Sequence, residues 1–377
     1  MTELLLHNLQ LVLPDEIVDG HLSIRDGRIA AIGTGRLRQP CAIDVGGDLV
    51  LPGLVELHTD NLERHLQPRP GVHWPAALAL AAHDSELLGA GITSACEALS
   101  LGYVAPGTEP LPAPLRICQA LAQAQAAQTL RVSHYLHLRA ELPCADLLEQ
   151  LPPLLAQPGL RLLSLTDHTP GQRQYRDLER YRHQCGMQPD AAQAWLQQAR
   201  TAQHQHRARN LAGALAMAQA SVPQLRLASH DDTTLEDVDE ALGYRADICE
   251  FPTTLAAARA AHAAGLTVVA GAPNLLRGRS HSGNVAALEL ARAGVLDAIS
   301  SDYVPGSLLP AIGVLQQQAG WSLPQAVRTA TLAPARALGL DDRGALAIGA
   351  RADLLRVRAD DSLRLVEVWV AGRRRLG

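Results

Sequence analysis

Lysine is absent from this chain, and all 33 of its basic residues are arginines. This absence excludes Schiff-base chemistry on a lysine, a phosphate-binding P-loop lysine and a carboxylated lysine that bridges two metal ions. Any anionic ligand must therefore be bound by arginine, whose planar guanidinium group can donate two parallel hydrogen bonds to carboxylate or phosphate oxygens.

Signals for a thiolate site and for a membrane segment are also missing. The six cysteines are widely scattered and form no Cys-x-x-Cys pair, which argues against a thiolate metal site or a redox motif. The N-terminus has no basic region before a long apolar core, and no run of about 18 apolar residues follows it. We therefore expect a soluble, cytoplasmic protein with buried, reduced cysteines.

The charge and the size of the chain narrow its partners and its fold. A net charge of −5 argues against electrostatic binding to nucleic acid or to an anionic membrane, and neither is expected as a partner. With 377 residues, 47% of them hydrophobic, the chain can form one large α/β-barrel domain and a smaller domain. The oligomeric state stays open, a homo-oligomer included.

The middle of the chain alternates apolar runs with helical patterns, which is typical of βα units around a parallel sheet. The predicted strands are 51–57, 92–98, 132–138, 161–167, 226–230, 246–251, 266–272 and 297–302. Eight strands are the number that a closed (β/α)8 barrel requires. We predict a TIM-type (β/α)8 barrel over residues 51–339.

Both ends of the chain are rich in short strands instead. Residues 1–50 contain turn signals such as Asp26-Gly27, and 340–377 contain the alternating segment 365–370. We predict that 1–50 and 340–377 together form a small composite β-sandwich domain.

Metal-ligating residue types stand at the ends of the predicted strands, where a barrel of this kind carries its catalytic groups. His58 and Asp60, two residues apart after the first strand, point to the same face and can hold one ion together. A lone histidine there is more often structural, but the whole set favours one or two divalent ions, zinc first, with manganese or iron as alternatives. The candidate ligands are His58, Asp60, Glu141, His168, His230 and Asp302.

This pattern resembles the amidohydrolase superfamily, in which His-x-His or a variant follows strand one, later histidines follow, and an aspartate follows strand eight. The resemblance implies that Asp60 replaces the usual second histidine. It also implies a barrel of the metal-dependent hydrolase kind. If the site holds two metal ions, the bridging ligand must be a carboxylate because lysine is absent. Glu141 is the preferred bridge, with Glu97 and Glu250 less favoured.

The resemblance also implies two catalytic residues. Asp302 is expected to orient the attacking water and take its proton, since the equivalent strand-eight aspartate does so in relatives that cleave amides. His230 is either a metal ligand or an acid to the leaving group, and the sequence does not separate these roles.

Five longer blocks narrow the resemblance to the phosphonate-metabolism proteins of the carbon-phosphorus lyase pathway. They are residues 58–72, 165–172, 229–233, 277–284 and 300–305. The resemblance implies hydrolysis of α-D-ribose 1-methylphosphonate 5-triphosphate to the 5-phosphate and pyrophosphate. The expected partner is therefore a small phosphorylated ribose.

A substrate with several negative charges needs local cations in a net-acidic protein. Arginine side chains, together with serine and backbone donors in a glycine-containing loop, suit phosphate oxygens. The candidate substrate-binding residues are Arg69, Arg173, Arg277, Arg279, Ser280, His281 and Asn284.

Two other functions compete with this interpretation. One is a cyclic-amide or N-acyl hydrolase on the same barrel, which the Arg277-Gly278-Arg279 loop disfavours because a neutral amide needs no clustered guanidinium groups. The other is a non-catalytic barrel that binds a phosphorylated ligand or acts as a scaffold for other enzymes.

Overall fold

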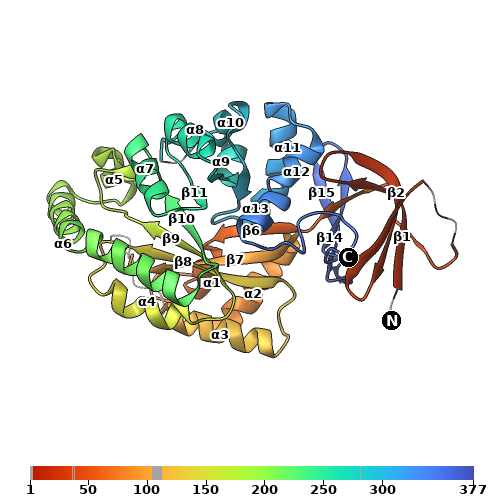
Figure 1. The fold of residues 1–377 in the computed structure, drawn as a ribbon, viewed down its shortest axis with the longest axis horizontal. Coiled ribbons are helices and arrows are strands. Elements are labelled where there is room, and N and C mark those ends of the chain that lie inside the picture. The colour runs from red at the N-terminus through yellow and green to blue at the C-terminus, as the bar shows by residue number, and fades with distance from the viewer. Residues whose placement is uncertain (1–2, 36, 38, 104–112, 281) are drawn as a thin grey trace.

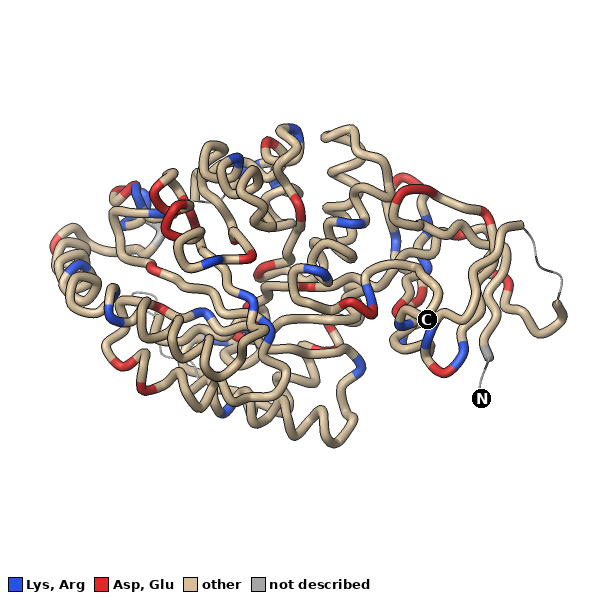
Figure 2. The backbone as a smooth tube through the Cα atoms, viewed as in Figure 1, with Lys and Arg blue, Asp and Glu red and all other residues tan. Residues whose placement is uncertain are grey.

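The computed structural model describes residues 3–35, 37, 39–103, 113–280 and 282–377. Two parts are seen in Figure 1, an α/β barrel and a smaller group of strands at one end, on the right of the view. Arginines and acidic residues are both spread along the chain rather than gathered at one end (Figure 2). Within the described residues, we find no helix with the length and hydropathy needed to cross a membrane.

Eight parallel strands form the barrel in chain order. They are β6 (Leu54–Thr59), β7 (Ile92–Leu101), β8 (Ser133–Glu141), β9 (Leu160–Thr166), β10 (Arg226–His230), β11 (Ile248–Glu250), β12 (Thr267–Gly271) and β13 (Ala298–Ser300). A parallel bridge between Thr59 and Asp302 joins the first strand to the end of the last, and Thr59 Oγ1 donates to the Asp302 carbonyl at 2.8 Å. The predicted (β/α)8 barrel is confirmed.

Helices surround this sheet. The strands are apolar on both faces, so the outer face of the barrel must also be covered from water. They are α2 (Ala76–Gly89), α3 (Pro114–Ala126), α4 (Leu147–Leu155), α6 (Pro189–Ser221), α7 (Leu235–Gly243), α8 (Leu255–Ala263), α10 (Ala287–Arg292), α11 (Leu308–Ala319), α12 (Leu323–Arg328) and α13 (Leu332–Ala337). Shorter pieces follow strand ends: α1 (Asn61–Leu66), η1 (Arg173–Tyr175), α5 (Leu178–Gln184), α9 (Ala272–Arg277) and η2 (Pro305–Ser307).

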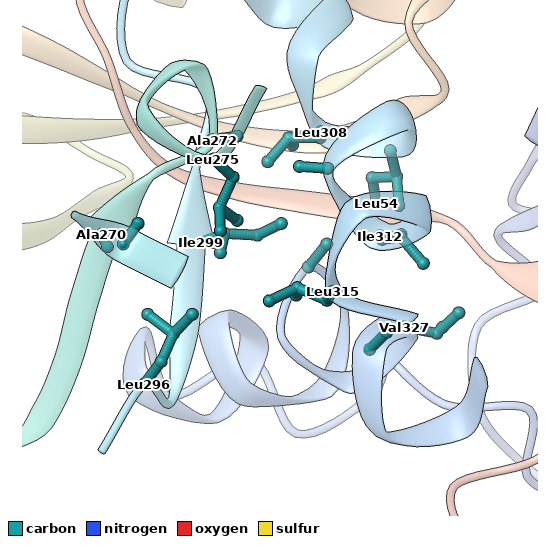
Figure 3. Packing of buried hydrophobic residues seen from close by; sticks show 14 of the residues in the cluster. Leu54, Ala270, Ala272, Leu275, Leu296, Ile299, Leu308, Ile312, Leu315 and Val327 are labelled. Atoms are coloured by element: carbon teal, nitrogen blue, oxygen red, sulfur yellow. The ribbon is translucent and has the colours of Figure 1, made fainter. Parts of the chain in front are cut away.

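Apolar packing between the last strands and the helices α11 and α12 illustrates how the outer layer is held. Ile299 of β13 and Leu275 of α9 belong to one buried cluster with Leu308 and Ile312 of α11 and Val327 of α12 (Figure 3). Removing this apolar surface from water is the main favourable contribution to folding. The packing fixes the barrel wall behind the strand ends.

The two ends of the chain share one sheet, as predicted. Its strands are β1 (Glu3–Val12), β2 (Ile17–Arg25), β3 (Arg28–Thr34), β4 (Ile43–Asp44), β5 (Leu49–Pro52), β14 (Leu354–Ala359), β15 (Leu363–Val370) and β16 (Arg373–Leu376). Their order is β16-β15-β14-β5-β1-β2-β3, with β4 beside β1. The sheet curls so that the turns at Gly27 and Gly372 lie close to each other. Ala352 N donates to Gly27 O at 2.9 Å, and Gly372 N donates to Ala352 O at 2.8 Å.

Gly53 divides the first predicted strand, 51–57, between the two sheets. Leu49–Pro52 pairs with β14 in the terminal sheet, whereas Leu54–Thr59 enters the barrel. A Cβ atom at Gly53 would lie 2.2 Å from Thr93 Oγ1, so glycine is needed at the crossing. The exact limits of the two domains, at residues 50 and 340, stay a prediction.

Candidate active site

A cavity of about 270 Å³ lies where the barrel strands end. Most of the predicted site residues line it, although they come from strands far apart in the sequence. Those residues are His58, Asp60, His168, His230, Arg277, Arg279, Ser280, Asn284 and Asp302.

Glu250, at the end of β11, is the centre of the histidine cluster. Its Oε1 accepts a hydrogen bond from His58 Nδ1 at 2.9 Å, and its Oε2 accepts from Ser164 Oγ at 2.6 Å and from His230 Nδ1 at 3.2 Å. Burial alone would raise the pKa of Glu250, but the nearby His58 and His137 hold it well below its usual range. This ionised carboxylate fixes the rings of His58 and His230 through Nδ1 and leaves their Nε2 atoms available.

His137 of β8 is not among the ligands that the sequence predicts. Its Nε2 lies 2.6 Å from Ser164 Oγ, while its Nδ1 is buried and has no hydrogen-bond partner among the described residues. Burial lowers the pKa of His137 to about 3 and also lowers that of His58, so both rings are neutral near pH 7. A neutral imidazole with an unused lone pair on one nitrogen can bind a metal ion through that nitrogen.

A second group joins His168, His230 and Asp231. The rings of His168 and His230 have centroids 5.7 Å apart, and His230 Nε2 lies 3.6 Å from Asp231 Oδ2. In this group, and in the group of His58, His137 and Glu250, one ligand atom from each residue lies within 4.8 Å of the others. These nitrogen and oxygen donors fit one or two divalent ions.

Glu141 contacts His168 instead of lining the cavity. Its Oε1 accepts from the His168 backbone N–H at 2.8 Å, and its Oε2 accepts from His168 Nδ1 at 2.6 Å and from Thr166 Oγ1 at 2.9 Å. Burial would raise the pKa of Glu141, but the charge and hydrogen bonds of His168 lower it. That Glu141 bridges two metal ions stays a prediction, and its placement favours orientation of His168.

Arg139, which the sequence did not single out, carries a buried positive charge in the cavity. Its side chain is 12% exposed, its Nη1 lies 3.7 Å from Asp60 Oδ2, and its Nε has no hydrogen-bond partner among the described residues. Burial and the negative charge of Asp60 raise the pKa of the neighbouring Asp302 to about 8. The sequence signal was an arginine between two apolar residues, Leu138 and Ala140, near the end of β8.

The predicted arginine loop forms the rim of the same cavity. Helix α9 ends at Arg277 because Gly278 has a positive φ of 69°, and Arg279 follows in the turn. Both arginines are exposed, and neither guanidinium group makes a hydrogen bond or ion pair with another described residue. Ser280 and Asn284 also line the cavity, while His281 lies outside the described residues.

Two other predicted substrate-binding arginines lie elsewhere. Arg69 is exposed in a turn that pairs with Val72, and it does not line the cavity. Arg173 is buried, and its Nη1 donates to the His230 carbonyl at 2.6 Å and to Asp232 Oδ1 at 2.7 Å. Arg173 therefore braces the end of β10, where its charge is already paired. Binding of substrate by either arginine stays a prediction without support from its position.

Comparison with known proteins agrees with this geometry. A model of the amidohydrolase family matches residues 191–375. The alpha-D-ribose 1-methylphosphonate 5-triphosphate diphosphatase of Escherichia coli (strain K12) is 42% identical over 378 residues, which cover 98% of this chain and 100% of that protein.

Solved structures of low identity share the fold. N-acetyl-D-glucosamine-6-phosphate deacetylase from Mycobacterium smegmatis has a TM-score of 0.64 at 19% identity, covering 99% of this chain and 100% of that one. Ochratoxinase from A. niger has a TM-score of 0.66 at 14% identity, covering 100% of this chain and 96% of that one. The full-length match at 42% identity shows that the chain belongs to the amidohydrolase family, as a relative of the alpha-D-ribose 1-methylphosphonate 5-triphosphate diphosphatase.

Proposed function

We propose that this protein is a metal-dependent hydrolase that converts α-D-ribose 1-methylphosphonate 5-triphosphate into the 5-phosphate and pyrophosphate. The observation that carries the proposal is one cavity that joins a group of histidines and carboxylates to a rim with two arginines. These are Arg277 and Arg279, whose guanidinium groups have no partner among the described residues. The name of the full-length relative supports the same reaction. A cytoplasmic location and a homo-oligomeric state stay predictions.

The metal ligands that we propose are the two buried groups of histidines and carboxylates. They are His58 with His137 and Glu250, and His168 with His230 and Asp231. Zinc is the proposed ion, with manganese or iron as alternatives, because mixed nitrogen and oxygen donors accept all three. A divalent ion held there would act as a Lewis acid and make a water molecule acidic enough to attack phosphorus near neutral pH.

Two residues beside these groups would act on the reacting phosphate. Arg139 would stabilise the negative charge that develops on the α-phosphoryl oxygens, because a buried guanidinium group with an unused Nε–H is held in place before the reaction. Asp302 would orient the attacking water and accept its proton at a carboxylate oxygen, because it lines the same cavity as His58 and His230. Asp60 stays a candidate metal ligand, because it lines the same cavity as His58.

The arginine rim would bind the departing pyrophosphate. Arg277 and Arg279 can each donate paired hydrogen bonds to phosphate oxygens, and Ser280 and Asn284 add polar groups at the same wall. In a chain with a net charge of −5 and no lysine, this loop supplies the positive charge that a triphosphate requires. A neutral cyclic amide would leave both arginines unused.

The test is release of pyrophosphate from the ribose triphosphate phosphonate by the zinc-loaded protein. Arg277→Met together with Arg279→Met should lower kcat/KM by at least roughly a hundredfold, since each arginine loses a charge-assisted hydrogen bond of about 1.5–3 kcal/mol. Arg139→Met should lower kcat by a similar factor with little change in KM. Arg328→Met is the matched control, because Arg328 pairs with the exposed Asp15 far from the cavity.

Two results would overturn the proposal. One is absence of pyrophosphate release from the zinc-loaded wild-type protein. The other is formation of ring-opened product from a hydantoin or from dihydroorotate, which would favour a cyclic-amide hydrolase.

A further inference from the structure

A second cluster of metal-ligating side chains lies between helices α1 and α2. Asn61 and His65 are four residues apart on α1, and His83 and Glu86 are three apart on α2, so each pair shares one face of its helix. The four side chains meet where the two helices pack together. None of them lines the cavity at the strand ends.

Two of the spacings between polar atoms of this cluster match a tetrahedral metal site, and two are shorter, at hydrogen-bond distance. Asn61 Nδ2 lies 3.3 Å from His83 Nδ1, 3.4 Å from His65 Nε2 and 2.8 Å from Glu86 Oε2. His65 Nε2 lies 2.7 Å from Glu86 Oε2. Tetrahedral bonds of about 2.0–2.1 Å to zinc place the ligand atoms about 3.3 Å apart. A half-turn of the Asn61 amide, which exchanges Nδ2 and Oδ1, completes two nitrogen and two oxygen donors.

His83 is held in the orientation that a metal ligand needs. Its Nε2 donates to Glu97 Oε2 at 3.0 Å, and both side chains are buried. With Glu97 accepting at Nε2, the Nδ1 atom of His83 faces the cluster, 3.3 Å from Asn61 Nδ2. A carboxylate behind a ligating histidine is the usual support of zinc sites.

We propose that Asn61, His65, His83 and Glu86 form a further metal site, which binds one divalent transition-metal ion such as Zn²⁺. Two imidazoles with two oxygens favour zinc over the oxygen-seeking magnesium and calcium ions. The ion can enter from solvent, because the side chains of His65 and Glu86 are 24% and 42% exposed. Bound there, it ties α1 to α2 and so fixes the segment that follows Asp60 at the active site.

The test uses the full-length protein loaded with Zn²⁺ and freed of excess ion. A crystal of this protein should show an anomalous peak at the zinc edge between the four side chains, apart from any peak at the strand ends. Metal analysis should find one zinc fewer per chain in the His65→Gln, Glu86→Gln double variant than in the wild type. His262→Gln, which changes an exposed histidine paired with Asp297, should keep the wild-type count.

Either of two outcomes overturns the proposal. One is a zinc-edge map with no peak at the cluster. The other is an equal zinc count in the double variant and the wild type, which would leave only a hydrogen-bond network that holds a proton. The crystal map needs no variant, so it decides the question even if the double variant does not fold. The anomalous peak does not depend on turnover. The proposed metal site can therefore be refuted while the proposed hydrolysis is confirmed, and the hydrolysis can be refuted while the metal site is confirmed.

Discussion

His134 of β8 is predicted to make the stability of the protein fall as the pH rises. Its ring is fully buried, with Nδ1 2.7 Å from Glu97 Oε1 and Nε2 3.3 Å from Asp84 Oδ1. Both ring nitrogens therefore donate to carboxylates, which requires the charged imidazolium. Burial alone would lower the pKa of His134, but the hydrogen bonds and charges of Asp84 and Glu97 raise it from 6.5 to about 9.

The size of the effect follows from this shift. The folded-state pKa of His134 lies above the unfolded value, so the stabilisation is complete below pH 6.5 and is lost as the pH rises through about 9. The rise of the pKa of His134 from 6.5 to about 9, at about 1.4 kcal/mol for each pKa unit, corresponds to about 3–4 kcal/mol. His134→Gln should abolish this loss. At pH 6.5 the variant should be about 3–5 kcal/mol less stable than the wild type, because two buried carboxylates lose their cation.

Urea unfolding followed by tryptophan fluorescence at pH 6.5, 7.5 and 9 measures both quantities. The matched control is His262→Gln, which changes the partly exposed pair of His262 with Asp297. Its free energy of unfolding should differ from that of the wild type by no more than about 1 kcal/mol. Equal pH dependence in His134→Gln and the wild type would refute the assignment of an imidazolium between these carboxylates.

Two other substitutions test the packing and the buried charges of the fold. Gly53→Ala should lower the free energy of unfolding by about 1–3 kcal/mol, because its Cβ would lie 2.2 Å from Thr93 Oγ1, whereas Gly89→Ala, with open space around its Cβ, should raise it by about 0.4–1 kcal/mol. Urea midpoints measure both, and an equal effect at the two glycines would contradict the clash. Arg173→Met should lower the free energy of unfolding by about 3–5 kcal/mol, because it leaves Asp232 unpaired. Adding Asp232→Asn should restore part of this stability. No recovery in the double variant would argue against the ion pair.

The order of the strands and the position of the metal-ligating residues were accessible from the sequence. Eight apolar runs alternate with helical patterns, and a parallel barrel places every strand end at one face. The pattern therefore predicted that His58, His168, His230 and Asp302 meet in one cavity, as the structure places them. The arginine loop could be found for the same reason, since it follows a strand end directly.

The tertiary structure alone decided which side chains touch. Strand-end position did not show that Glu250 would hold His58 and His230, while Glu141 would turn to His168, because these contacts depend on the register of neighbouring strands. Nor did it show Arg139 in the cavity.

The cluster between α1 and α2 depends on tertiary packing even more strongly. His65 and Glu86 are far apart in sequence and meet only because the two helices pack face to face. The sequence by itself determined which chemical groups the chain owns and the end of the barrel at which they gather. Packing decided their partners and charge states, because burial and hydrogen bonding arise only when distant segments come together.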